Sequence, residues 1–545
     1  MLHRVRLQRL IPDTALALLL SAGLALSPSI GAAQTSGNVT AFMQAIAETA
    51  YDDREMAAFY RDNGYEGIWT GTDEASVNRR NALMAAIARA PQHALPAAHY
   101  DLTQLTDMLG NIETQRDLGR AEVELSRLFL TYARDVQTGI LAPGEVVSDI
   151  KREVPLRDGG ELLARMASED PTFVLRSLPP KSQEYARLMR AKIELEQKMA
   201  RGGWGPKVPA STLQPGQSGE AVIALRNRLI AMGYMDRSAS SVYDSALQKA
   251  VQSFQIAMAL EPDGVAGGRT MQEINTDIEQ RLPSIVVAME RERWLNFEEG
   301  RGARHIWVNL TDFKARIIDN DKITFETRSV IGSNVSDQRT PEFSDTMEYM
   351  EINPYWNVPN SIAVNEYLPA MLASGGGAAG HLQLVDGRGN VVPRGAINWG
   401  AYSPRSFPLN LRQPPGNGNA LGLVKFMFPN RYNIYLHDTP AKSLFSREVR
   451  TFSHGCIRLN DPFDFAYAIL AKQEADPEGY FQRILRSGAN TQVQLEQEIP
   501  VHLVYRTAYT SATGQLTFRD DVYGRDRVIF DALVREGVRI GEPNS

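Results

Sequence analysis

The sequence predicts a multidomain protein in which an α-helical scaffold and a small three-helix module precede a mainly-β, sandwich-like domain. Three observations predict this architecture. The length of 545 residues allows three or four domains of about 100–200 residues each. Apolar residues recur at helical spacing up to about residue 300 and alternate at strand spacing beyond it. A segment rich in Gly and Pro, 204–216, divides the helical part in two.

The composition is that of a globular protein, with 43% hydrophobic and 22% charged residues. The 58 basic and 64 acidic side chains give a formal net charge of −6, and no basic cluster stands out along the chain. Nucleic-acid-binding proteins carry basic patches, so we expect no nucleic-acid partner.

Residues 1–33 have the pattern of a secretory signal peptide. Arginines at positions 4, 6 and 9 precede an uncharged, mostly apolar run from Thr14 to Leu26, and residues 31–33 are small, as signal peptidase requires. The alternative is an uncleaved membrane anchor, because residues 14–33 are uncharged and about 20 such residues span a bilayer. Both interpretations predict that the folded part of the chain is exported.

Residues 34–205 are expected to form the helical scaffold domain. Its clearest helix runs from Ala121 to Val136, where large apolar side chains recur at a spacing of 3.6 residues. Two earlier helices are expected around residues 42–46 and 56–60. His93 and His99 flank a loop-like stretch, and we interpret both as structural or surface residues.

Residues 211–276 form the predicted three-helix module. Its first helix follows Gly219 and ends at Gly233, its second follows Asp244 as N-cap, and its third begins near Thr270. Residues 277–300 hold a connecting helix, which we expect to return the chain to the first helical region. The module would then be an insertion in the scaffold.

Residues 304–510 are predicted to form the mainly-β domain, as a sandwich or a partly open barrel, and 511–545 a C-terminal extension. Between 361 and 416 the alternation degrades into Gly- and Pro-rich sequence, which we interpret as a lid-like insertion. The strand-like runs are 306–310, 315–319, 325–331, 346–352, 423–428, 433–437 and 501–507.

The chemistry is expected at Cys456, the only cysteine in the chain. One interpretation is an inert thiol, since free cysteine is often buried. The other is a nucleophile, because an exposed thiol is a liability in an exported protein unless it has a function. A thiolate attacks carbonyl carbon, and a nearby imidazole raises the ionised fraction by forming a thiolate–imidazolium pair. His437, at the end of a strand-like run, is the better base, and His454 the second candidate.

The residues around the thiol suggest further roles. Gly455 lets the backbone approach the substrate, and the amides of residues 454–456 are placed to form an oxyanion hole. Arg458 lies on the same side of an extended segment as Cys456 and suits binding of a carboxylate.

Two resemblances are carried by these motifs. Residues 211–276, with Gly219, Gly233, Asp244, Gly264 and Thr270, resemble the peptidoglycan-binding domain type 1. His437, fifteen intervening residues and then Ser453-His454-Gly455-Cys456-Ile457-Arg458-Leu459-Asn460 resemble the signature of L,D-transpeptidases with a YkuD-type catalytic domain. Arg339-Thr340-Pro341 and Trp356-Asn357-Val358-Pro359 also look like that family, and the whole arrangement is similar to its large Gram-negative members.

The resemblance implies a cysteine-dependent peptidoglycan L,D-transpeptidase of the periplasm, associated with the cell wall. Cys456 would attack the carbonyl after the L-centre of diaminopimelate in a tetrapeptide stem, release D-alanine, and pass the acyl group to a second stem as a 3→3 cross-link. His437 would be the base, held by a backbone carbonyl. His454 and Gly455 would form the oxyanion hole, and Arg458 and Asn460 would bind substrate.

The resemblance also implies that no metal or organic cofactor takes part and that carbapenems inhibit the enzyme. The implied partners are donor and acceptor stem peptides, with other cell-wall enzymes as possible associates. The acceptor, either a stem or a lipoprotein, is left open by the sequence.

Three alternatives remain open at this stage. A zinc hydrolase would use His437, Asp438, His454 and Cys456, although no H-E-x-x-H or paired C-x-x-C motif is present. An L,D-carboxypeptidase or cross-link hydrolase would use the same nucleophile and give the acyl group to water. A non-catalytic wall-binding protein would need neither His437 nor Cys456.

Overall fold

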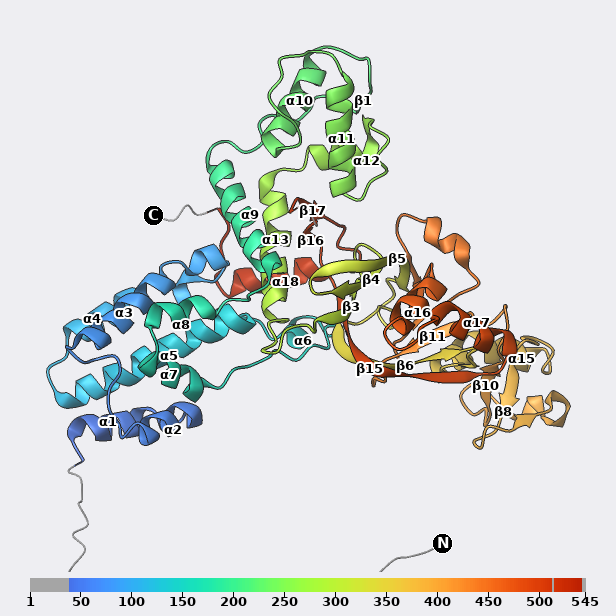
Figure 1. The fold of residues 1–545 in the computed structure, drawn as a ribbon, viewed down its shortest axis with the longest axis horizontal. Helices are drawn as coiled ribbons and strands as arrows, with labels where there is room; N and C mark the ends of the chain where they lie inside the picture. The colour runs from blue at the N-terminus through green and yellow to red at the C-terminus, as the bar shows by residue number, and fades with distance from the viewer. Residues whose placement is uncertain (1–38, 512–513, 542–545) are drawn as a thin grey trace, which may run out of the picture.

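The computed structural model describes residues 39–511 and 514–541. A helical body, a small helical module and a β-rich body follow one another along the chain and form three lobes that meet one another (Figure 1). The predicted multidomain class is confirmed. The predicted signal segment, 1–33, lies outside the described residues. Within the described ranges, no helix has both the length and the apolar character needed to cross a bilayer.

The helical body is built around α5, which contains the predicted helix 121–136 and continues it at both ends. Thr114 and Asp117 form a capping box at its start, and Phe129 and Val136 are fully buried in the core. Its helices are α1 (Ala41–Thr49), α2 (Arg54–Asp62), α3 (Glu74–Ile87), α4 (Leu102–Gly110), α5 (Gln115–Thr138), α6 (Pro143–Val146), α7 (Gly159–Ser168), α8 (Pro171–Ser177) and α9 (Gln183–Ala200).

The small module holds the three predicted helices. The Asp244 side chain accepts a hydrogen bond from the Leu247 amide and so caps the second helix, as predicted. Gly233 ends the first helix with a φ of 88°, a conformation that favours glycine. The elements are β1 (Thr212–Leu213), α10 (Glu220–Met232), α11 (Ser245–Ala257), β2 (Ala266–Gly267) and α12 (Gly268–Ile274).

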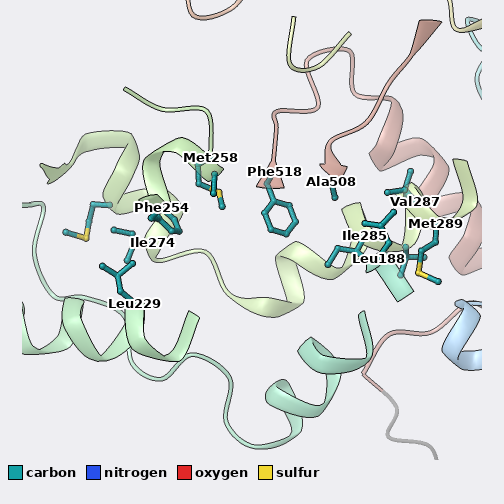
Figure 2. Packing of buried hydrophobic residues seen from close by; sticks show 14 of the residues in the cluster. Leu188, Leu229, Phe254, Met258, Ile274, Ile285, Val287, Met289, Ala508 and Phe518 are labelled. Atoms are coloured by element: carbon teal, nitrogen blue, oxygen red, sulfur yellow. The ribbon is translucent and has the colours of Figure 1, made fainter. Parts of the chain in front are cut away.

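The chain leaves the module through α13 (Ile278–Arg293), which packs against α9 and also contacts α5 and α18 (Arg525–Arg535). The module is thus joined to the rest of the chain between two paired helices (Figure 1). Phe518 of the hairpin β16 (Ala508–Thr510) and β17 (Leu516–Phe518) lies between Met258 of the module and Ile285 of α13 (Figure 2). One apolar cluster therefore runs from the module into the scaffold.

The β-rich body is a sheet that closes into a ring. Its strand order is β5-β14-β12-β11-β6-β15-β3-β4, and β4 pairs with β5 again, while β13 adds to β5 outside the ring. Apolar side chains on the inner face, such as Ile306, Phe426 and Leu436, are fully buried. The strands are β3 (Arg304–Asn309), β4 (Lys314–Asp319), β5 (Lys322–Gly332), β6 (Phe343–Ile352), β11 (Val424–Met427), β12 (Leu436–His437), β13 (Thr451–Ser453), β14 (Ile457–Leu459) and β15 (Thr491–Val504).

The predicted lid segment folds into a small unit with a core of its own. A sheet with the order β7-β10-β8-β9 covers helices whose residues Leu368 and Met371 are buried with Trp356 and Leu411. The unit consists of β7 (Trp356–Asn357), α14 (Asn360–Ile362), a π-helical turn (Ala363–Tyr367), α15 (Leu368–Ala373), β8 (Gln383–Val385), β9 (Val391–Val392) and β10 (Asn410–Gln413).

Two details of the β-rich body differ from the sequence prediction. The run 433–437 forms a strand only at its last two residues, because Asn433 has a φ of 54° and the Asn430 side chain binds the backbone of Tyr432 and Ile434. Two helices that were not predicted, α16 (Pro462–Leu470) and α17 (Pro477–Ser487), follow β14 and pack on each other.

Candidate active site

Two neighbouring strands, β12 and β14, and the residues directly before them carry the side chains predicted for the site. β12 pairs in parallel with β14, so that Leu436 lies opposite Ile457. Both residues are fully buried in the core of the ring. Because side chains alternate along a strand, the residues before and after them project from the other face of the sheet. That face carries Tyr435, His437, Cys456 and Arg458.

The thiol of Cys456 is partly buried and has two polar neighbours. Its Sγ lies 3.4 Å from the carbonyl oxygen of Asn433, to which it donates, and it also forms a hydrogen bond with the Tyr435 side chain. Burial raises the pKa of the thiol from 9.0 to about 11, although the Tyr435 contacts and the charge of Arg458 oppose this rise. At neutral pH the side chain is therefore a thiol.

His437 is buried, with 4% of its surface exposed, and its Nδ1 contacts the carbonyl oxygen of Asp438. Because a carbonyl oxygen only accepts hydrogen bonds, Nδ1 carries the proton and Nε2 keeps its lone pair. Burial and, next, the charge of Arg458 lower the pKa of His437 from 6.5 to about 3. His437 is neutral at pH 7 and has a nitrogen that can accept a proton.

At rest, the Cys456 thiol and the His437 imidazole are therefore both neutral. The thiolate–imidazolium pair expected from the sequence is not favoured here, because burial penalises both charged forms. The ring of Tyr435 contacts both groups, since its centroid lies 5.7 Å from that of His437 and its side chain bonds to Cys456.

The loop before Cys456 is held by its own polar groups. Gly455 has a φ of 111°, and a Cβ at this position would lie 3.1 Å from Ile434 Cδ1. Ser453 Oγ donates to the Cys456 carbonyl over 2.5 Å and accepts from the Gly455 amide over 3.2 Å. Because the Gly455 N–H is already engaged, the amides of His454 and Cys456 are the better oxyanion donors in this loop.

Arg458 and Asn460 differ in their surroundings. Arg458 is half-buried, its Nε is buried without a hydrogen-bond partner, and no carboxylate pairs with it among the described residues. Burial lowers its pKa, and the neighbouring Cys456 raises it. The Asn460 side chain instead donates to Asp461 over 2.7 Å at the start of α16. The structure thus gathers Arg458 with Cys456, whereas the Asn460 side chain turns toward the helix.

The lid contacts the site at two points. Glu366, in its π-helical turn, lies with Oε1 2.6 Å from His454 Nε2, and both side chains are exposed. Tyr435 packs against the apolar core of the lid. This lid segment therefore lies beside the Cys456 loop, and His454 faces it.

Three contributing residues were missed in the sequence, Asn433, Tyr435 and Glu366, and Thr340, which lies in the motif Arg339-Thr340-Pro341, was given no role there. The alternation that places Tyr435 on the same side as His437 was readable in the run 432–437. The others follow from the fold, since Thr340 Oγ1 donates to the Gly455 carbonyl across 115 residues of sequence and Glu366 meets His454 across 88.

The residues proposed for a zinc site do not form one. Within residues 39–511 and 514–541, no group of three or more His, Cys, Asp or Glu side chains is arranged to hold a metal ion. The Asp438 carboxylate accepts hydrogen bonds from Lys442 Nζ, over 2.8 Å, and from the Leu423 amide, over 2.9 Å.

Three segments of the chain match models of known families. Residues 303–488, which include the whole constellation above, match the L,D-transpeptidase catalytic domain, YkuD. This chain contains a YkuD L,D-transpeptidase catalytic domain. Residues 218–274 match a model described as "Putative peptidoglycan binding domain", and residues 54–191 match a model described as "Scaffold domain". The transpeptidase domain is thus combined with a peptidoglycan-binding type 1 domain.

A curated protein of Haemophilus influenzae, named "Putative L,D-transpeptidase", is 33% identical over 225 residues. The match covers 41% of this chain and 45% of that protein, so less than half of the relative's length is spanned.

Solved L,D-transpeptidase structures are more distant. One from Xylanimonas cellulosilytica is 14% identical over 55% of this chain and 98% of its own, with a TM-score of 0.17. One from Stackebrandtia nassauensis is 13% identical over 55% and 96%, with a TM-score of 0.20.

Proposed function

We propose that this protein is a peptidoglycan L,D-transpeptidase that forms 3→3 cross-links from tetrapeptide donors through a thioester at Cys456. The observation that carries this proposal is the shared face of Cys456, His437 and Arg458 inside a matched transpeptidase domain. The peptidoglycan-binding domain on the same chain supports peptidoglycan as the substrate.

In the first half-reaction, Cys456 Sγ forms a bond to the carbonyl carbon that follows the L-centre of diaminopimelate. The thiol proton passes to His437 Nε2, and the C–N bond to D-alanine breaks as the amine takes that proton. The developing oxyanion accepts hydrogen bonds from the amides of His454 and Cys456, a contribution of about 10²–10³ in rate for each donor.

In the second half-reaction, the side-chain amine of diaminopimelate on an acceptor stem attacks the thioester. His437 takes the proton from the amine, the C–S bond breaks and the thiol is restored. Arg458 supplies a cation without a carboxylate partner on the face that carries Cys456, which suits a free carboxylate of a stem peptide. Asn460 would act on substrate only if its contact with Asp461 were released.

The location follows from the proposed substrate. Enzymes of the cell wall act outside the cytoplasm, and we propose that the exported body works in the periplasm in contact with the wall. Residues 1–33 would direct this export. Carbapenems, as acylating agents, would react with Cys456.

The decisive experiment is incubation of the full chain with a disaccharide-tetrapeptide, followed by mass analysis of the products. Cross-linked dimers with loss of one alanine support the transpeptidase, tripeptide alone would replace it with an L,D-carboxypeptidase, and no product would refute both. Cys456→Ala and His437→Ala should abolish product. His381→Ala, a histidine on the lid, is the matched control and should retain activity.

A further inference from the structure

The loop that carries Cys456 is supported from behind by a buried hydroxyl. Thr340, which is completely buried, donates from Oγ1 to the Gly455 carbonyl over 2.7 Å and accepts from the Gly332 amide over 2.9 Å. The Gly455 carbonyl and the Cys456 N–H belong to one planar trans peptide unit, in which they point in opposite directions. A bond that fixes the carbonyl therefore also fixes the direction of the Cys456 N–H.

Thr340 is in turn held by Arg525, at the start of α18. Arg525 Nη2 donates to the Thr340 carbonyl over 2.8 Å, and Nη1 donates to Glu342 over 3.0 Å. The other oxygen of Glu342 binds Arg291 of α13. Arg525, Glu342 and Arg291 are 1%, 2% and 3% exposed. Buried charge-assisted hydrogen bonds of this kind hold their partners in a defined geometry, and the planar guanidinium uses two of its donors here.

Tyr523 completes this support. Its hydroxyl donates to the Gly332 carbonyl over 2.5 Å, so the tyrosine and Thr340 both bind the last residue of β5. The Tyr523 ring lies 4.7 Å from the Arg525 guanidinium carbon. Both residues lie beyond residue 488, where the match to the transpeptidase domain ends. The direct contact to the thiol loop, from Thr340, therefore lies inside the matched domain, whereas Arg525 and Tyr523, which hold Thr340 and Gly332, lie outside it.

We propose that Thr340 and Arg525 are positioning residues for acyl transfer. They hold the Gly455–Cys456 peptide so that its N–H is directed at the oxyanion of the tetrahedral intermediate. This inference rests on the proposed function in one respect, that Cys456 becomes acylated. It extends the site to a C-terminal helix that contributes no group to the chemistry itself.

The test uses p-nitrophenyl acetate and the full chain. Cys456 Sγ forms the bond to the acetyl carbon, the ester C–O bond breaks, p-nitrophenolate leaves and the thiol proton passes to His437. The burst of p-nitrophenolate therefore reports acylation without any peptidoglycan. Alkylation by iodoacetamide is measured in parallel, because substitution at its sp³ carbon forms no oxyanion and needs no oxyanion hole.

Thr340→Val keeps the shape of the side chain and removes the hydroxyl, whereas Thr340→Ser keeps the hydroxyl. We expect the valine variant to lower the acylation rate about 10²-fold, the typical effect of one oxyanion donor, with alkylation within about twofold of the wild type. The serine variant should recover acylation to within about threefold. Equal losses of acylation and alkylation in the valine variant, or no loss at all, would overturn the proposal.

Arg525→Lys tests the next contact, since a single ammonium cannot reproduce the planar fork. We expect acylation to fall at least about tenfold, and the double variant with Thr340→Val to be no slower than Thr340→Val alone, because both act on one peptide. Arg527→Lys, an exposed arginine on the same helix, is the matched control. Wild-type acylation in Arg525→Lys, or additive losses in the double variant, would contradict the proposal.

Two further measurements complete the design. Thermal melting identifies any variant that fails to fold. The comparison of Thr340→Val with Thr340→Ser then decides alone whether the proposal holds. Turnover of the disaccharide-tetrapeptide tests the proposed function, whereas the ester burst tests the positioning, so the failure of either is told apart from the failure of the other.

Discussion

The ionisation state of Cys456 gives the most direct test of how this site works. With a thiol pKa of about 11, only about one part in 10³ is thiolate at pH 8, whereas a thiol at the ordinary 9.0 is about one tenth ionised. The free enzyme should therefore react with a simple alkylating agent about 100-fold more slowly at pH 8 than an exposed cysteine does. Its rate should rise about tenfold per pH unit up to pH 10.

The measurement is alkylation by iodoacetamide, followed by intact mass between pH 6 and 10.5, with a small free thiol as reference. Cys456 is the only cysteine, so the adduct needs no assignment. Tyr435→Phe should react still more slowly, because the Tyr435 hydrogen bond lowers the thiol pKa. Arg458→Gln should do the same through the loss of a nearby positive charge. Tyr402→Phe, on the lid, is the control for the tyrosine change.

A plateau with a midpoint below pH 8 would refute this reasoning. It would mean that the thiolate is stable at rest, as in a thiolate–imidazolium pair, and that burial does not dominate the site. Faster alkylation of Arg458→Gln would refute the electrostatic part alone, because the sign of that effect follows from the charge of the guanidinium.

Three further results are expected. Gly455→Ala forces a φ of 111° on an L-residue and brings its Cβ to 3.1 Å from Ile434. Thermal melting should therefore show that the free energy of unfolding falls by about 1–3 kcal/mol. An unchanged melting temperature would exclude this strain. Burial lowers the pKa of His93, His437 and His502 to about 3 in the folded chain, whereas histidine in the unfolded chain binds its proton near pH 6.5. The free energy of unfolding should therefore decrease as the pH falls from 6.5 toward 3, by up to about 1.4 kcal/mol per pH unit for each histidine. A melting temperature independent of pH in this interval would contradict this expectation. A chelator should leave tetrapeptide turnover unchanged, whereas a loss restored by zinc would revive a metal mechanism.

The fold class was predictable because the spacing of apolar residues changes from helical to strand-like near residue 300. Long elements such as α5 and β6 carry enough repeats to identify their type. The lid sheet was not predictable, since its strands are two to four residues long and contain too few repeats to show a period. The ring closure was also hidden, because the second pairing of β5 with β4 depends on how far the sheet curls.

The candidate site was predictable where chemistry is local. The motif around Cys456 and its spacing from His437 are properties of the sequence. The neutral state of both groups is not, because burial depends on the lid and the ring. The contact of Thr340 with Gly455 joins residues 115 positions apart in the sequence, and neither a threonine nor a glycine by itself indicates such a contact.

The docking of the peptidoglycan-binding domain has a geometric consequence. Its two connections leave through the paired helices α9 and α13, Arg519 of the C-terminal hairpin donates to the Ala257 carbonyl over 2.8 Å, and Arg269 bridges to Glu448 and Asp520. These contacts hold the domain in one position relative to the rest of the chain, whereas a flexible linker would let that distance vary. Under the proposed function, a glycan strand bound to this domain would lie at a nearly constant distance from Cys456, and cross-links would form at that distance from the strand.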